Sequence, residues 1–128
     1  QKIIDPDGNV VKNIEPEIAG RVEASTQTFE IVKKAMWEVV NNPSGTGRHV
    51  KVKGVVVAGK TGTAQAGSSR GLNHAWFTCF APFDNPEIAV TVMIEHVEKG
   101  IHGGEASCPL AQKILDIYFG NVTLEDLV

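Results

Sequence analysis

The spacing of hydrophobic and polar positions changes along this chain, and it predicts which segments are helices and which are strands. Residues 26–41 place apolar side chains three or four positions apart, which is the spacing of one helix face. Ser25 can cap the first turn, and Pro43 ends the pattern because proline disfavours helix in the residue before it. We therefore predict a helix over 26–41. Its apolar positions are Phe29, Val32, Met36, Val39 and Val40.

Later segments have strand patterns. Alternation over 50–53 suits the entry to a strand, and the β-branched run over 55–58 predicts a strand. A second strand is predicted over 74–81 and a third over 87–96. A short turn at 83–86 separates these two, so the pair should be antiparallel. The third strand is apolar at even and odd positions, so we expect it to be covered on both faces.

The ends of the chain complete the predicted order. Residues 1–14 predict a hairpin around the turn signal Asp-Pro-Asp-Gly-Asn, and 15–24 connect it to the helix. A Gly-rich loop is predicted over 65–73 and a Gly/His loop over 97–104. The predicted fold class is α+β, an antiparallel sheet flanked by helices, in the order hairpin, helix, three strands, helix.

A second helix is predicted over 106–119. Pro109 falls in its first turn, where proline is tolerated, and Gly120 can end it. We expect its apolar stripe to comprise Leu110, Ile114, Ile117 and Tyr118.

Composition excludes several classes of function. The chain has 128 residues, 42% hydrophobic and 21% charged, which suits one globular domain. The net charge is −3 and no cluster of Lys and Arg occurs, so we expect no nucleic-acid partner. No apolar run approaches the roughly 18 residues that span a bilayer. The chain begins at Gln1 without a signal-peptide pattern, and we interpret it as a piece of a larger protein.

The cysteines and histidines predict neither a disulfide framework nor a metal centre. Cys79 lies in an apolar run that is typical of a buried free thiol, and Cys108 is the only other cysteine. His96, His102 and Cys108 lack the tight spacing of zinc ligands. We therefore predict no metal and no cofactor.

One segment matches the pattern of a phosphate-binding loop. Residues 54–61 fit Gly-x-x-x-x-Gly-Lys-Thr. Such a loop needs a strand before its first glycine and a helix that opens at the lysine. Here the inner residues 55–58 are the best strand formers nearby, and the sequence after Thr61 is a poor helix start. The pattern therefore does not favour nucleotide binding.

The same residues suit the Lys-Thr-Gly motif of serine acyl-transferases that act on penicillin and peptidoglycan peptides. At the end of a strand, the Lys60 cation favours a substrate carboxylate, and the hydroxyls of Thr61 and Thr63 can donate to the same group. Gly62 lets a ligand lie against the backbone, and an N–H just after it can face a developing oxyanion. The tripeptide Lys-Thr-Gly by itself fits an ordinary strand end better.

The surrounding residues distinguish these alternatives. The block 58–65 (Ala-Gly-Lys-Thr-Gly-Thr-Ala-Gln) is followed by 74–77 (His-Ala-Trp-Phe), 80–82 (Phe-Ala-Pro) and 86–90 (Pro-Glu-Ile-Ala-Val). In this order they resemble class B penicillin-binding proteins, most of all the type that builds lateral-wall or spore peptidoglycan. The resemblance covers about residues 3–119. It implies a β-lactamase/transpeptidase-like domain, of which residues 1–128 would be the C-terminal part.

The resemblance also implies an activity and a site. Such proteins are D,D-transpeptidases at the extracytoplasmic face of the bacterial membrane; they crosslink peptidoglycan stem peptides through a serine acyl-enzyme and are acylated by β-lactams. Their Lys-Thr-Gly strand is an edge strand of a five-stranded sheet. Carried over, Lys60, Thr61 and Thr63 would bind the substrate or β-lactam carboxylate, Gly62 would be a further substrate-binding residue, and the Thr63 N–H would be one oxyanion-hole donor. Trp76 would pack rather than bind.

Two motifs of this family are missing from the chain. No serine is followed by Lys at the third position or by Asn at the second, whereas Ser-x-x-Lys and Ser-x-Asn precede Lys-Thr-Gly in the family. We therefore expect the chain alone to be inactive, with the nucleophile and the membrane anchor outside it. The alternative is a non-catalytic peptide-binding or structural module with a transpeptidase-like surface.

The missing segment also predicts a partner. In the family the strand equivalent to 87–96 is interior and pairs with a strand from the start of the domain. An exposed apolar edge recruits another strand. We expect the N-terminal half of the domain to pair there. A second copy of the chain and the 1–14 hairpin are the alternatives.

Overall fold

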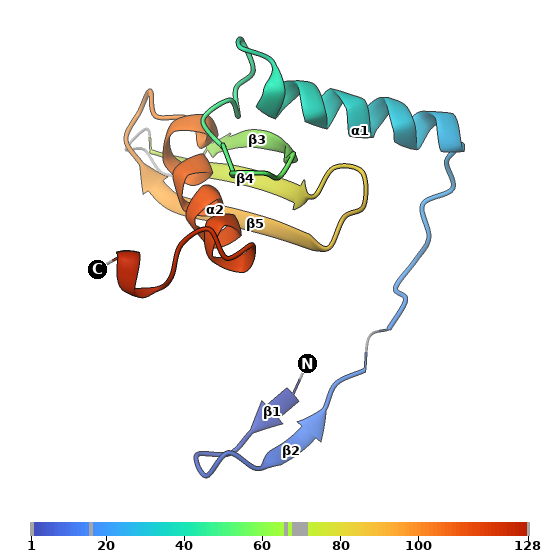
Figure 1. The fold of residues 1–128 in the computed structure, drawn as a ribbon, viewed down its shortest axis with the longest axis vertical. Coiled ribbons are helices and arrows are strands. Elements are labelled where there is room, and N and C mark those ends of the chain that lie inside the picture. The colour runs from blue at the N-terminus through green and yellow to red at the C-terminus, as the bar shows by residue number, and fades with distance from the viewer. Residues whose placement is uncertain (1, 16, 66, 68–71, 128) are drawn as a thin grey trace.

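The computed structural model describes all residues except 1, 16, 66, 68–71 and 128. Its elements are β1 (Lys2–Ile4), β2 (Val10–Asn13), α1 (Thr26–Asn41), β3 (Ala58–Gln65), β4 (Asn73–Ala81), β5 (Ile88–Val97), α2 (Gly103–Tyr118) and the 3₁₀ helix η1 (Glu125–Leu127). Figure 1 shows α2 lying across one face of the β3–β4–β5 sheet, with α1 beside β3. The β1–β2 hairpin stands apart, at the end of an extended segment. The predicted α+β class is confirmed.

The main sheet has the order β3–β4–β5, and both pairings are antiparallel, as predicted for the second and third strands. The family resemblance implied five strands. The described residues contribute three strands to this sheet and two to the separate hairpin, where Lys2 lies opposite Asn13. Within the described part of the chain, β3 and β5 are therefore the two edges of the main sheet.

The strand predicted over 55–58 is wrong except for Ala58. Val52 and Val55 form only an isolated bridge around Gly54, whose φ of 75° suits a turn. The strand instead runs through the Lys-Thr-Gly residues, because β4 offers partners from Phe80, opposite Ala58, to Asn73, opposite Gln65. Pairing with a long neighbour outweighs the strand propensity of the valines. The motif therefore occupies the middle of β3 rather than the end of a strand.

The helix α1 has the predicted bounds, and the Ser25 Oγ caps it by accepting the Thr28 N–H at 3.1 Å. Only the C-terminal part of its apolar face is covered. Val40 is buried, whereas Phe29 and Val32 are about half exposed. The N-terminal half of α1 extends past the sheet, which leaves these two side chains without cover from the strands (Figure 1).

The core lies between α2 and one face of the sheet, and it includes Phe77, Cys79, Val90, Val92, Cys108, Ala111 and Leu115. The prediction for β5 is wrong in one respect. Val90 and Val92 are buried, but Ala89, Thr91 and Met93 on the other face are exposed, because α2 covers one face only. In the described part of the chain, no helix is long and apolar enough to cross a membrane.

The predicted stripe of α2 is also wrong. Leu110, Ile114 and Tyr118 are 44%, 43% and 51% exposed. The face against the sheet consists of smaller residues, namely Gly103, Gly104, Ser107, Cys108 and Ala111, followed by Leu115. The helix approaches the strands so closely that side-chain size decides which face turns inward. It also begins three residues earlier than predicted, which moves Pro109 from the first turn to the second.

Candidate functional site

The residues of the Lys-Thr-Gly-Thr segment leave β3 on opposite faces. Side chains alternate along a strand, and directly paired residues share a face. Lys60 lies opposite Thr78, which is exposed, whereas Thr61 lies opposite Phe77, which is fully buried. Thr63 therefore shares the α2 face with Thr61. The Lys60 Nζ donates to the carbonyl of Thr61 at 2.6 Å, so its ammonium stays beside its own strand.

A cavity of about 300 Å³ adjoins the two threonines. Three segments line it: Thr46, Arg48 and His49 before β3, residues 61–63 within β3, and residues 102–105 at the start of α2. Lys60 is not part of this lining. The structure thus brings three of the four predicted site residues together around one cavity and places the fourth outside it.

Two glycines let α2 form one wall of this cavity. A Cβ on Gly103 would lie 2.6 Å from the Gly62 carbonyl oxygen and would also collide with the Trp76 carbonyl. A Cβ on Gly104 would collide with the Thr46 carbonyl. These neighbours are backbone atoms, which cannot rotate away. Glycine is therefore required for the helix to start directly against β3 and the segment before it.

The segment before β3 contributes site residues that the sequence did not single out. The Thr46 Oγ1 lies 2.7 Å from the Thr61 Oγ1, within hydrogen-bond distance. Gly47 fixes this segment on α1, because its N–H donates to the Val39 carbonyl at 2.9 Å. Arg48 and His49 carried no sequence signal of their own.

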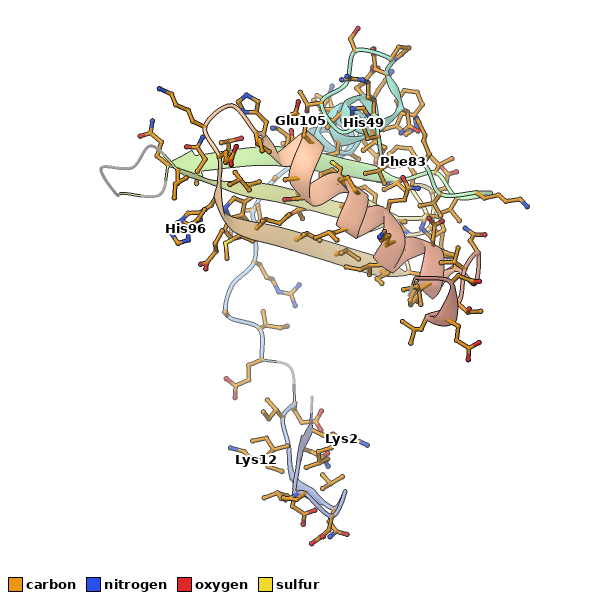
Figure 2. The ribbon with its side chains drawn as sticks, turned by 90° about the vertical axis from the view of Figure 1, so that its left-hand side faces the viewer. Lys2, Lys12, His49, Phe83, His96 and Glu105 are labelled. Carbon is orange, nitrogen blue, oxygen red and sulfur yellow. The ribbon has the colours of Figure 1, made fainter. Side chains whose placement is uncertain are left out.

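One cation and one carboxylate line the cavity. Among the described residues that line it, Arg48 is the one Lys or Arg side chain, and it is exposed. The Glu105 carboxylate lines the same cavity, but it accepts the backbone N–H of His102 at 3.1 Å and so caps α2. Figure 2 shows His49 and Glu105 at the same end of α2, above the sheet. A cation and threonine hydroxyls together suit a carboxylate.

The remaining candidates lie elsewhere. Trp76 is 37% exposed and lies on the Lys60 face of the sheet, opposite Gly62. The segment after Lys60 is a strand, so the helix that a phosphate-binding loop requires does not occur there. The rings of His74 and His96 are 5.0 Å apart, and no group of three His, Cys, Asp or Glu gathers within the described residues.

Both cysteines are free and buried, as predicted for Cys79. Burial raises the pKa of Cys79 to about 11. Burial also raises the pKa of Cys108 to about 12, with a smaller contribution from the neighbouring Cys79. Both thiols therefore stay protonated near neutral pH and are unsuited to nucleophilic chemistry.

A Lys-Thr-Gly-Thr segment on an edge strand is the arrangement that the resemblance to penicillin-binding proteins implied. Comparison with known families identifies the same class of protein. The model of the penicillin-binding protein transpeptidase domain matches residues 1–116. The chain belongs to this family, which confirms the resemblance found in the sequence.

Two curated proteins are similar to this chain in sequence. The chain is 40% identical over 104 residues to the peptidoglycan D,D-transpeptidase MrdA of Haemophilus influenzae, an alignment that covers 70% of this chain and 16% of that protein. It is 34% identical over 117 residues to stage V sporulation protein D of Bacillus subtilis, covering 88% of this chain and 18% of that protein. The chain therefore spans less than a fifth of these curated relatives.

A solved structure of a penicillin-binding protein is also similar to this chain. The crystal structure of Pseudomonas aeruginosa PBP2 in complex with WCK 5153 is 32% identical in sequence and superimposes with a TM-score of 0.64. The match covers 91% of this chain and 23% of that one. The arrangement of α1, the three-stranded sheet and α2 is thus similar to part of a penicillin-binding protein.

Proposed function

We propose that this chain is the substrate- and β-lactam-binding portion of a peptidoglycan D,D-transpeptidase, as the C-terminal part of its transpeptidase domain. The enzyme would act at the extracytoplasmic face of the bacterial membrane, held by an anchor outside this chain. The observation that carries the proposal is the position of Thr61, Gly62 and Thr63 on an edge strand beside a cavity. An edge strand leaves backbone groups open to an extended peptide.

Each residue of the segment has a role in this proposal. The hydroxyls of Thr61 and Thr63 donate to the substrate carboxylate, and Gly62 lets the peptide lie close to the strand. The Thr63 N–H donates to the oxyanion that develops when a serine attacks the scissile carbonyl. The Lys60 ammonium polarises the hydroxyl network of that serine. No cofactor takes part.

The nucleophile comes from outside this chain in the proposed mechanism. Its oxygen forms an ester with the stem peptide, and the terminal residue leaves as a free amine. The amine of a second stem peptide then takes the acyl group and releases the serine. The buried Ser107 is not a candidate, because its Oγ donates to the Ala75 carbonyl at 2.9 Å inside the core.

Labelling with a fluorescent penicillin tests this function. We expect a stoichiometric adduct on the transpeptidase that joins this chain to a Ser-x-x-Lys segment, and no adduct on the chain alone. In the joined protein, Lys60→Ala should raise the acylation barrier by roughly 2–4 kcal/mol without unfolding it. Lys113→Ala, on the exposed side of α2, is the control.

Two results would contradict the proposal. The first is an adduct on a serine of the chain alone. The second is binding of a stem peptide by the joined protein without any acylation, which is the result that a non-catalytic peptide-binding module would give.

The same proposal assigns a partner to β5. This strand is an edge within the described residues, and Met93 on its open face is 42% exposed. The segment that supplies the nucleophile would pair with this edge. Val90, Val92 and Ile94 amides should then exchange slowly in the joined protein and faster in the chain alone. A chain that dimerises in sizing experiments, with these amides protected, would instead show that a second copy pairs there.

A further inference from the structure

The cation that serves the substrate carboxylate can be identified from the alternation of β3. A carboxylate bound by the Thr61 and Thr63 hydroxyls lies on the α2 side of the strand. Lys60 leaves the strand on the other side, and its Nζ already donates to the Thr61 carbonyl at 2.6 Å. The family resemblance would assign all three side chains to one carboxylate. The geometry separates the lysine from the two hydroxyls.

Arg48 lies on the α2 side of β3, whereas Lys60 leaves the strand on the opposite side. Arg48 lines the same cavity as both threonines, and its side chain is exposed. The guanidinium donates to the Gly45 carbonyl at 3.3 Å, which is long for an N–H···O hydrogen bond. Among the described residues, no carboxylate forms an ion pair with it. Most of its five N–H donors are thus available to a ligand.

The segment that carries Arg48 also orients a hydroxyl of the site. Thr46 lies two positions before Arg48, and its Oγ1 is 2.7 Å from the Thr61 Oγ1. The segment is anchored on α1, since the Gly47 N–H donates to the Val39 carbonyl, and it is closed as a turn by the Val50 N–H, which donates to the Gly47 carbonyl at 3.0 Å. One anchored turn thus places a guanidinium and a hydroxyl partner beside β3.

We propose that Arg48 binds the carboxylate of the substrate or β-lactam, together with Thr61 and Thr63, and that Thr46 is a positioning residue for the Thr61 hydroxyl. The inference rests on the proposed function. A guanidinium fits a carboxylate with two parallel hydrogen bonds, which a lysine ammonium cannot supply. Lys60 is then free to act on the nucleophile alone. The ligand class is a peptide or β-lactam with a free carboxylate, as opposed to its ester or amide.

The test compares benzylpenicillin with its methyl ester as acylating agents of the joined transpeptidase. Arg48→Gln should slow acylation by the free acid about 10- to 100-fold, the range for a hydrogen bond between charged groups, and should slow the ester little. Arg48→Lys should fall between. Lys60→Ala should slow acid and ester alike, because it acts on the nucleophile. Arg21→Gln, which removes the same charge from the connector before α1, should change neither rate.

The preference for the acid over the ester in this assay also tests the role of Thr46. Thr46→Val should reduce the preference for the acid, and Thr46→Ser should restore it. A Thr46 with a merely structural role would change the unfolding midpoint and leave the preference intact.

Failure of the inference is distinguishable from failure of the proposed function. If Arg48→Gln is acylated with an unchanged preference for the acid, the inference is overturned and the function stands. If no variant is acylated at all, the function fails. In that case an NMR titration tests whether the chain has a carboxylate site. The isotope-labelled chain is titrated with acetyl-D-alanyl-D-alanine and with its carboxamide. Acid-specific shifts at Arg48, Thr61 and Thr63 would still support a carboxylate site, and their absence would refute it.

Discussion

Replacing Gly59 with alanine perturbs the contact between β3 and the core. A Cβ at this position would lie 2.6 Å from the Phe77 Cζ and 2.8 Å from the Thr78 carbonyl oxygen, whereas ordinary contact begins at 3.4 Å. The ring would have to retreat by most of an ångström. Phe77 is fully buried, so its neighbours in the core resist that movement.

The magnitude follows from two opposing effects. Overpacking a well-packed core costs typically 1–3 kcal/mol. Replacing glycine with alanine recovers about 0.5–1 kcal/mol, because the unfolded chain loses freedom. We expect the free energy of unfolding to fall by roughly 1–2 kcal/mol. A urea titration followed by circular dichroism would show a lower midpoint at unchanged slope. Gly20→Ala is the control, since no atom lies within 4 Å of its Cβ.

A double-mutant cycle tests the cause. Phe77→Leu removes the ring atoms nearest to the new methyl group, so Gly59→Ala should cost less in that background than in the wild type. An equal cost in both backgrounds, or a Gly59→Ala protein as stable as the wild type, would refute the reasoning.

Three further predictions concern stability and thiol reactivity. Ser107→Ala should lower the free energy of unfolding by about 1 kcal/mol, measured in urea, because the Ala75 carbonyl loses its buried donor; an unchanged midpoint would contradict this. Ser25→Ala should cost about 1 kcal/mol and speed hydrogen exchange at the start of α1, and unaltered exchange there would count against the cap. Cys79 and Cys108 should react with a thiol reagent at pH 8 only after denaturation. Because their folded pKa values of about 11 and about 12 exceed the unfolded value of 9.0, stability should be intact below pH 9 and decline as the pH rises toward them. Fast native labelling would show that the thiols are accessible.

The elements that could be predicted from sequence are those with local signals. The α1 helix has a capping serine, a regular apolar face and a following proline, and its bounds agree with the structure. The β1–β2 hairpin has a dense turn signal, and Asp5 accepts the backbone N–H groups of Asp7 and Asn9 within that turn. In each case the information lies within a few residues, so no distant contact is needed to interpret it.

The elements that were mispredicted depend on distant partners. β3 is extended by pairing with β4, which overrides the propensity of its own glycines. The face that α2 turns toward the sheet depends on how closely the helix approaches the strands. The spacing of apolar residues along the helix does not predict that distance. Thr46, Arg48 and His49 were missed for the same reason. They reach the site only because their segment is anchored on α1 by the Gly47 N–H.

The alternation of β3 also constrains where a nucleophile can stand if the proposed function holds. On the α2 side, Thr61 and Thr63 face a cavity that is also lined by the segment before β3 and by the start of α2. On the other side, Lys60 shares a face with Trp76 and Met93, which lie opposite each other and are 37% and 42% exposed. Among the described residues, α2 lies on the carboxylate side of the sheet, whereas no helix lies over the lysine side. A serine activated by Lys60 must therefore approach over the face that carries Trp76 and Met93, and the segment that brings it would bury both side chains.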